Sequence, residues 1–369
     1  MPSRTTNSME RVLRAFAFER PDRIPRFDSF WEFPDEWRSA LGETHEINDI
    51  AVWCPREGTF PTRQRELRRE GRSIYRIDEW GRTVRSQVGS YFEETLEVAI
   101  PKGTDPDSVT FDLPGLSGRY VMAEDEATTQ SALRTEKARL CVFGKTGGPY
   151  LRTTFVRGET QFLMDIAEDP FLARALADKM ADHLTGIAVE QIRRWDLRDT
   201  GVWIYDDMAY NAGPMFSPAS FETVFLPAYR RMVESYKAAG ARYVLVHSDG
   251  NIMPILDMLV DAGIDGINPV EPRAGMDMAA IRERFPNLIL TGGMDNTDTL
   301  INGPKERIEA EARGIIELGR DGGVVIGTHS ISPEIPLENY MTYDGVCRTD
   351  VWVSEGVAED IRPQRDKGY

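Results

Sequence analysis

The chain has 369 residues, of which 41% are hydrophobic and 28% charged, a composition typical of a folded globular protein. Its formal net charge of −16, from 44 basic and 60 acidic side chains, argues against binding to nucleic-acid phosphates. No apolar run has the length of a membrane span or a secretory signal. Three widely spaced cysteines, Cys54, Cys141 and Cys347, argue against a disulfide framework or a Cys-rich zinc site. We therefore expect a cytoplasmic protein.

The N-terminal part of the chain predicts additions that precede a more regular core. Helical spacing of apolar residues, period-2 alternation, and clusters of Pro, Gly and Asp indicate a helix, strands and a loop, respectively. The predicted elements are, in chain order, a helix at 8–19, a strand at 26–31, a hairpin within 72–100 with strands at 73–77 and 82–84, and a surface loop at 101–118.

From about residue 138 onward, short apolar runs alternate with helical segments. This alternation predicts a parallel sheet. Nearly every late run ends in polar residues, which favours a barrel over a doubly wound sheet, because strand ends in a barrel converge on one mouth. The runs are 140–143, 201–205, 243–246, 264–268, 288–290 and 324–326, the first followed by a predicted turn at 144–149 (GKTGGP) that lacks the spacing of a phosphate loop.

We therefore predict an α/β fold of the (β/α)8 TIM-barrel class. The whole chain, 1–369, is expected to form a single domain. Within it, residues 1–135 hold the N-terminal helix, hairpin and loop additions, and residues 136–350 hold the regular β/α part of the barrel.

The sharpest chemical pattern follows the run at 243–246. Residues i and i+2 of an extended segment point the same way, so His247 and Asp249 should face one point. His329 follows another run, and two histidines with one carboxylate suit zinc or another divalent ion with open coordination positions. Glu271 is a candidate fourth ligand or general base. The same residues could instead form a hydrogen-bonded polar network without a metal.

Other polar and aromatic residues at the predicted strand ends are weaker candidates. Adjacent carboxylates repel each other, so at least one of Asp206 and Asp207 should face solvent or a partner, where it could transfer a proton or cap a loop. Asp295 follows two glycines and could orient a substrate or form a plain turn. Aromatic side chains that could line the mouth for an apolar substrate are Phe27, Phe30, Trp31 and Phe33, and Tyr205 and Tyr210 are weaker candidates for orienting a substrate.

Seven motifs together resemble the uroporphyrinogen decarboxylase superfamily, in its branch of metal-dependent, corrinoid-linked methyltransferases. Their order and spacing carry the resemblance, which covers most of the chain. They are RVLRAFAFERPDRIPR (11–26), DEWGRTVR (78–85), DDMAYNAGPMFSPASFETVFLPAYRRM (206–232), HSDGNI (247–252), INPVEPRAGMDM (267–278), LTGGMDN (290–296) and GTHSISPEIPLENY (327–340).

The resemblance implies different chemistry in different branches. True uroporphyrinogen decarboxylases carry an arginine-rich segment resembling R-Q-A-G-R that binds substrate carboxylates. The matching stretch after Pro25 reads RFDSFWEFPDEW, which is acidic and aromatic and argues against porphyrinogen decarboxylation. The methyltransferase branch binds zinc through H-x-C and a later cysteine, and the matching positions are His247, Asp249 and His329. Imidazole and carboxylate ligands leave a metal a stronger Lewis acid than thiolates do, which suits methyl removal from an O- or N-methyl donor.

The predicted function is thus a metal-dependent methyltransferase or demethylase. Zn²⁺ or another divalent metal would be bound at His247, Asp249 and His329. A separate corrinoid protein would accept the methyl group of a small-molecule donor, because this chain lacks the D-x-H-x-x-G corrinoid motif. The assigned roles are catalysis for Asp206, Asp207 and Glu271, and substrate binding for Tyr205, Tyr210, Asp295 and Trp31.

Two alternatives remain open at this point. One is a metal-free decarboxylase or lyase acting on a small carboxylic acid, with Asp206 or Asp207 as the proton donor. The other is a barrel that binds a ligand without turnover, which the loss of both cysteine ligands would permit. The resemblance also implies a homodimer, whereas nucleic acid and membrane are not expected as partners.

Overall fold

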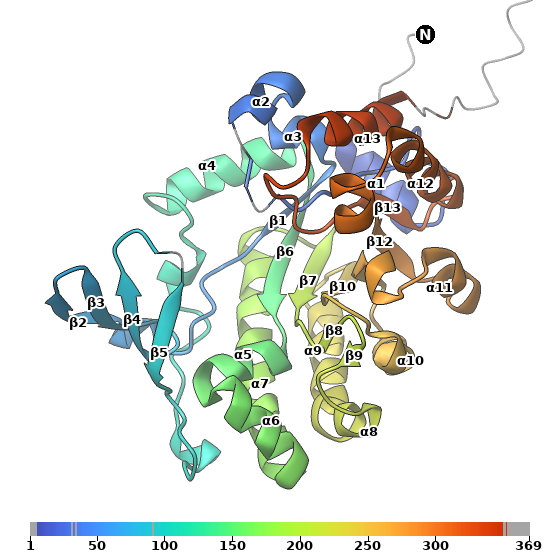
Figure 1. Ribbon diagram of the computed structural model, residues 1–369. Coiled ribbons are helices and arrows are strands. Elements are labelled where there is room, and N and C mark those ends of the chain that lie inside the picture. Colours follow the sequence, from blue (N-terminus) through green and yellow to red (C-terminus); the bar gives the residue numbers. More distant parts are fainter. Residues whose placement is uncertain (1–5, 31, 34, 91, 350–351, 353–369) are drawn as a thin grey trace, which may run out of the picture.

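The computed structural model describes residues 6–30, 32–33, 35–90, 92–349 and 352. At its centre is a curled sheet of seven parallel strands in the order β1-β6-β7-β10-β11-β12-β13 (Figure 1). Parallel strands need crossover connections, and these are supplied by the helices between the strands. The strands are β1 (Ile50–Trp53), β6 (Cys141–Gly147), β7 (Gly201–Tyr205), β10 (Tyr243–His247), β11 (Gly266–Val270), β12 (Ile289–Gly293) and β13 (Val324–Gly327).

Residues 25–30 lie between the two ends of this sheet. The Phe27 N–H donates to the carbonyl of Ile326 in β13 at 2.9 Å, and on the other side the Asp49 N–H donates to the carbonyl of Arg26 at 2.8 Å. The strand predicted here forms only isolated bridges to its neighbour. The predicted α/β class is therefore confirmed, while the central sheet has seven strands among the described residues rather than the eight of the predicted barrel.

Helices cover the outer face of the curled sheet (Figure 1). Within the described part of the chain, none of them combines the length and apolar character needed to span a bilayer. They are α1 (Ser8–Phe16), α2 (Asp35–Leu41), α3 (Thr44–Ile47), α4 (Glu126–Lys137), α5 (Pro149–Arg157), α6 (Glu159–Glu168), α7 (Pro170–Arg194), α8 (Pro218–Ser220), α9 (Leu226–Ala238), α10 (Met253–Asp261), α11 (Met278–Arg284), α12 (Lys305–Leu318) and α13 (Leu337–Thr349), with π-helical turns η4 (Phe221–Phe225) and η6 (Asn296–Ile301) and short 3-10 turns η1 (Pro61–Arg63), η2 (Pro106–Ser108), η3 (Ser117–Tyr120) and η5 (Pro272–Ala274).

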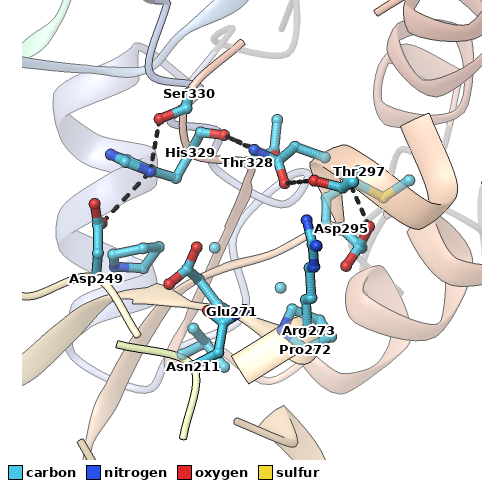
Figure 2. Close-up of a pocket in the computed structure, with 16 residues that line it drawn as sticks. Asn211, Asp249, Glu271, Pro272, Arg273, Asp295, Thr297, Thr328, His329 and Ser330 are labelled. Carbon is cyan, nitrogen blue, oxygen red and sulfur yellow. Dashed lines mark hydrogen bonds and ion pairs between the residues drawn. The ribbon is translucent and has the colours of Figure 1, made fainter. Parts of the chain in front are cut away.

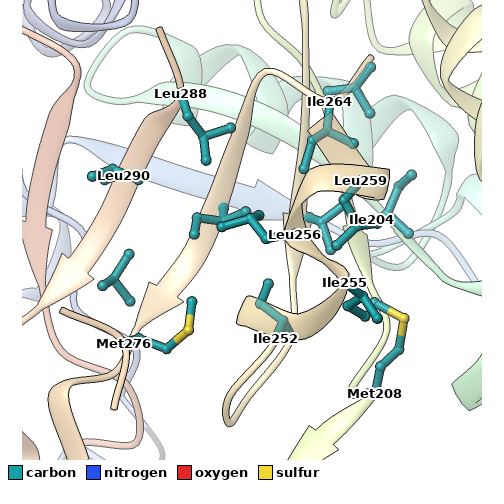
Figure 3. Packing of buried hydrophobic residues seen from close by; sticks show 14 of the residues in the cluster. Ile204, Met208, Ile252, Ile255, Leu256, Leu259, Ile264, Met276, Leu288 and Leu290 are labelled. Atoms are coloured by element: carbon teal, nitrogen blue, oxygen red, sulfur yellow. The ribbon is translucent and has the colours of Figure 1, made fainter. Parts of the chain in front are cut away.

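Alternate residues of each strand fill two separate cores. Trp203 and Leu245 belong to the cluster inside the curled sheet, whereas their neighbours, such as Ile204, belong to the cluster between the sheet and the helices. Figure 3 shows part of this outer cluster, including Leu256 and Leu259 of α10. Full burial of one such leucine contributes about 1.5–3 kcal/mol. Inward-facing residues that follow this inner core along the strands therefore lie at the carboxyl end of the sheet.

Helix α1 packs against the inner core. The ring of Phe16 packs against Phe143 and Tyr243, with centroid distances of 5.6 and 5.1 Å. The helix ends at Phe16, before the predicted end at residue 19, and Phe18 adopts a left-handed backbone conformation with φ of 57°. Apolar side chains of α1 thus close this end of the inner core.

A second sheet of four antiparallel strands lies at the edge of the molecule (Figure 1). The predicted hairpin is confirmed by its two middle strands, which pair Ser73 with Gln87 and Ile77 with Thr83. The first strand, with the sequence RELRRE, is not predicted because it is fully exposed and lacks alternating apolar residues. The strands are β2 (Arg65–Glu70), β3 (Ser73–Ile77), β4 (Thr83–Gln87) and β5 (Glu93–Glu97), and a two-stranded ribbon, β8 (Ala209–Tyr210) and β9 (Gly213–Pro214), follows β7.

Strand β6 continues beyond its predicted end, which corrects the turn predicted at 144–149. Residues 144–147 pair in parallel with β7. A Cβ on Gly144 would lie 2.5 Å from the side-chain oxygen of Gln191 in α7, so glycine is needed there for close packing rather than for a turn. The chain leaves the sheet only at Gly148, just before α5.

Candidate metal centre

Two histidines and an aspartate meet at the carboxyl edge of the sheet. His247 is the last residue of β10, Asp249 follows it by two residues, and His329 follows β13. Asp249 Oδ1 lies 3.5 Å from His247 Nε2 and 3.4 Å from His329 Nδ1. One ligand atom from each of the three side chains lies within 4.8 Å of the others. The structure thus brings together the three predicted metal ligands, which we call the triad.

The ring of His247 is fixed from two directions. Its Nδ1 lies 2.6 Å from Oδ1 of Asn268, the residue paired with it on β11. Tyr205 stacks on the ring with a centroid distance of 4.0 Å and an angle of 14°. Burial lowers the pKa of His247 to about 3, so the ring is neutral. Since an amide oxygen can only accept a hydrogen bond, Nδ1 carries the hydrogen and donates it to Asn268 Oδ1, and the Nε2 lone pair faces Asp249.

Asp249 Oδ1 is buried but has no hydrogen-bond partner among the described residues. Burial, together with the nearby carboxylates Asp207 and Glu271, raises the pKa of Asp249 to about 7. An unsatisfied buried carboxylate oxygen between two neutral imidazoles is costly unless a cation binds there. Two nitrogens and one carboxylate oxygen are the donors of many divalent metal sites that keep positions open for substrate. The residues present therefore fit a divalent metal.

His329 lies on a strained turn. Ser330, the next residue, has φ of +57°, which is uncommon for a residue with a side chain. Its Oγ lies 2.9 Å from His329 Nδ1, and Asn296 Nδ2 donates to the His329 carbonyl at 2.8 Å. Burial also lowers the pKa of His329. These contacts hold the second imidazole toward Asp249, and the strain at Ser330 is of the kind that tertiary structure maintains at functional sites.

A pocket of about 240 Å³ opens beside the triad. Figure 2 shows Asp249 and His329 on one side of it, Arg273 on the other and Glu271 between them. Glu271 Oε2 accepts the N–H of Gly250 at 2.6 Å, and Glu271 is not part of the group whose ligand atoms lie within 4.8 Å. Glu271 is therefore placed to contact a molecule in the pocket, while its role as a ligand or a base stays a prediction.

The adjacent carboxylates Asp206 and Asp207 have different surroundings. Asp206 is fully buried, where it accepts the N–H groups of Tyr150 and Leu151 at the start of α5 and the hydroxyl of Tyr229. Burial raises the pKa of Asp206 to about 7. Asp207 Oδ1 instead lies 3.7 Å from His247 Nε2. Of the two, only Asp207 is brought to the triad, and the bonds of Asp206 are those of a residue that positions α5.

The other predicted substrate residues are dispersed. Asp295 lines the pocket, but its Oδ1 accepts the backbone N–H groups of η6, including that of Thr297 at 2.9 Å, so it caps this turn. Tyr205 contacts His247 as described, whereas Tyr210 is 56% exposed on β8 and does not line the pocket. Trp31 lies outside the described residues.

Three residues at this edge of the sheet are missed by the sequence analysis. Asn268 ends an apolar run, and its position opposite His247 depends on strand register. Arg273 follows the Glu-Pro dipeptide after β11 and lines the pocket. Lys145 lies inside β6, in the segment predicted as a turn, with Nζ 3.7 Å from the Tyr205 ring centroid. The sequence does contain a signal for Lys145, because it follows the inward-facing Phe143 by two residues. That spacing places both side chains on the same face only if the strand continues through residue 145.

Comparison with known proteins supports the same part of the chain. The family model described as uroporphyrinogen decarboxylase (URO-D) matches residues 126–347. The methylcobamide:CoM methyltransferase MtaA of Methanosarcina barkeri (strain Fusaro) is 30% identical over 135 residues, and a second Methanosarcina barkeri MtaA is 28% identical over 134 residues. Each match spans 36% of this chain and only 39% of the relative's length.

A solved structure supports the fold. The methyltransferase from Methanosarcina mazei superposes with a TM-score of 0.61 at 17% identity, covering 93% of this chain and 98% of that one. The family model covers more than half of the chain, including every strand from β6 to β13 and all three residues of the triad. The chain therefore belongs to the uroporphyrinogen decarboxylase (URO-D) family.

Proposed function

We propose that this chain is a metal-dependent methyltransferase of the URO-D superfamily. It would transfer a methyl group from an O- or N-methylated small molecule to a corrinoid held by a separate protein. The similarity to MtaA and to the Methanosarcina mazei methyltransferase supports the reaction class. The observation that carries the proposal is the buried, unsatisfied Asp249 Oδ1 between two neutral imidazoles.

His247, Asp249 and His329 would hold the divalent metal, and Zn²⁺ is the ion that best suits this donor set. A bound divalent cation supplies Lewis acidity, which stabilises negative charge on the heteroatom that loses its methyl group. Imidazole and carboxylate donate less electron density than the thiolates of the related zinc sites. The donor set therefore favours removal of a methyl group over delivery of one to a thiol.

The chain's own side chains would orient the donor. Asn268 holds the tautomer of His247, and Ser330 holds the ring of His329. Glu271 and Asp207, the two carboxylates whose charges act on Asp249, would keep the heteroatom close to the triad and exchange a proton with it. The pocket of about 240 Å³ admits a small molecule but not a corrinoid ring, so the corrinoid would approach from outside.

The test begins with metal analysis of the purified full-length protein. We expect about one equivalent of divalent metal in the wild type and a large loss in His247→Ala and Asp249→Ala. His45→Ala is the matched control, because His45 lies in α3 outside the triad. Equal and negligible metal in the wild type and His247→Ala, after growth in zinc, would falsify the metal centre.

Activity is then measured with reduced cobalamin and a panel of methoxylated and N-methylated compounds, by the spectral change that accompanies methylation of cobalt. We expect a rate that chelation abolishes and that His247→Ala lowers by about 100-fold or more. Decarboxylation or lyase activity that survives chelation would instead support the metal-free alternative.

A further inference from the structure

A second chamber, of about 420 Å³, is lined by Tyr205, the residue that stacks on His247. It shares no lining residue with the pocket in Figure 2. Its lining combines apolar and aromatic side chains with polar ones, among them Asp28, His45, Glu136 and a single lysine. The lining residues that matter here are Phe27, Phe30, Ile50, Val52, Tyr205 and Lys145, and we call this space the Lys145 chamber.

Strand β6 directs Lys145 into this chamber. Cys141 and Phe143 face the inner core, and side chains alternate along a strand, so Lys145 continues the same inward-facing row one layer closer to the carboxyl end. Barrel interiors are normally filled by layers of apolar side chains. A half-buried lysine in this row therefore requires a reason other than packing.

The described residues do not neutralise Lys145. Among the described residues, none forms an ion pair or a hydrogen bond with Lys145 Nζ. This nitrogen instead lies over the Tyr205 ring, 3.7 Å from the ring centroid. Asp28 lines the same chamber, but its carboxylate already accepts Arg26 Nε at 2.6 Å and the Tyr340 hydroxyl at 2.8 Å. Glu136 also lines the chamber and forms no ion pair with Lys145 in the described part of the chain. The ammonium group is therefore available to an external anion.

Tyr205 connects the chamber to the triad. His247 stacks on this ring at 4.0 Å and Lys145 lies over it at 3.7 Å, and two groups this close cannot share one face, so they lie on opposite faces. A molecule held by Lys145 would then lie one aromatic ring away from His247. Aromatic walls and one cation together recognise a flat, apolar body that carries a negative charge.

We propose that the Lys145 chamber binds a small aromatic carboxylate, with the carboxylate on the Lys145 ammonium and the ring against Phe27 and Phe30. This binding is separate from the proposed function, because the chamber contains none of the triad residues and the methyl donor would lie in the pocket beside the triad.

The test compares two probes that differ in charge but hardly in shape, 4-methoxybenzoate and 4-methoxybenzamide. Their binding to the full-length protein is measured by calorimetry in the presence of a chelator, so that no metal contributes. We expect the wild type to prefer the benzoate by about tenfold or more, the effect of one hydrogen bond between charged groups. The preference should vanish in Lys145→Gln and persist in Lys145→Arg, which keeps the charge if the first variant folds poorly.

Arg273→Gln provides the matched control, because Arg273 is the cation that lines the other pocket. It should leave the preference for benzoate unchanged. Loss of the preference in Arg273→Gln, equal binding of both probes to the wild type, or no binding of either would each overturn the proposal. Because these measurements use neither metal nor corrinoid, their outcome does not depend on the proposed function.

Discussion

Two carboxylates at opposite ends of the central sheet have opposite environments. Asp49, just before β1, is buried, and its oxygens accept the guanidinium groups of Arg11 at 2.6 Å and Arg23 at 2.8 Å. Asp249, just after β10, has a buried oxygen without a partner in the described structure. The amino end of the sheet is therefore saturated by the chain itself, whereas the carboxyl end leaves its donors free for a ligand. This is the division between stability and function that is typical of β/α barrels.

The largest expected effect is on the amino end. Asp49→Ala removes the acceptor of Arg11, of Arg23 and of the Arg26 N–H, although Arg11 keeps its ion pair with Asp22. Buried donors left unsatisfied cost about 1–3 kcal/mol each, so the total is about 3–5 kcal/mol. We expect the free energy of unfolding, measured in urea, to fall by this amount with the metal content per folded protein unchanged. Asp35→Ala, which removes an exposed partner of Arg38, should leave it nearly unchanged, because exposed ion pairs contribute little. Similar losses from both variants would show that the Asp49 contacts are not special.

A buried histidine that is satisfied by the chain extends the comparison to pH. His183 Nε2 lies 3.0 Å from the Glu57 carbonyl, and burial lowers the pKa of His183 from 6.5 to about 4. The unfolded chain therefore binds a proton at a higher pH than the folded one, and stability falls as the pH drops from about 6.5 to 4. This contribution amounts to about 3 kcal/mol across that window. His183→Gln should flatten the pH dependence of the free energy of unfolding. An unchanged profile in this variant would refute the assignment.

The contact between Asn268 and His247 is expected to matter for metal affinity rather than for folding. Asn268→Ala frees the His247 ring to change its tautomer and orientation. Loss of a hydrogen bond that holds a metal-binding histidine typically lowers metal affinity by about 10–100-fold. Competition with a chromophoric chelator measures this change. Asn302→Ala, which removes an exposed asparagine from the end of η6, is the control. If Asn268→Ala keeps the wild-type affinity, the hydrogen bond does not position the ligand.

The smallest expected effect has the opposite sign. In the metal-free protein, Asp249→Asn removes a partly buried charge that faces Asp207 and Glu271. We expect the free energy of unfolding to rise by about 1 kcal/mol, a value reduced because the side chain is 39% exposed and solvent screens the repulsion. The same variant should lose metal binding. A destabilised Asp249→Asn protein under chelation would contradict the view that this carboxylate is kept for a ligand.

Local patterns predicted much of this protein. Strand periodicity located the core of β7 and β10, and the i, i+2 rule placed His247 and Asp249 on one side. These features depend on neighbours along the chain, which the amino-acid sequence displays directly. The same alternation directs the adjacent side chains of Asp206 and Asp207 to opposite sides. The sequence does not show which of the two faces the triad, so both remained candidates.

Tertiary structure decided the rest. The approach of His329 to Asp249, the pairing of Asn268 with His247 and the inward direction of Lys145 all depend on sheet curvature and strand register. The closing segment at 25–30 likewise forms isolated bridges where a strand was predicted. By itself, the sequence determined which residues end strands and which face of each strand they share, because backbone geometry repeats over two residues. Only the folded sheet decided which strand ends meet, because that depends on contacts between residues far apart along the chain.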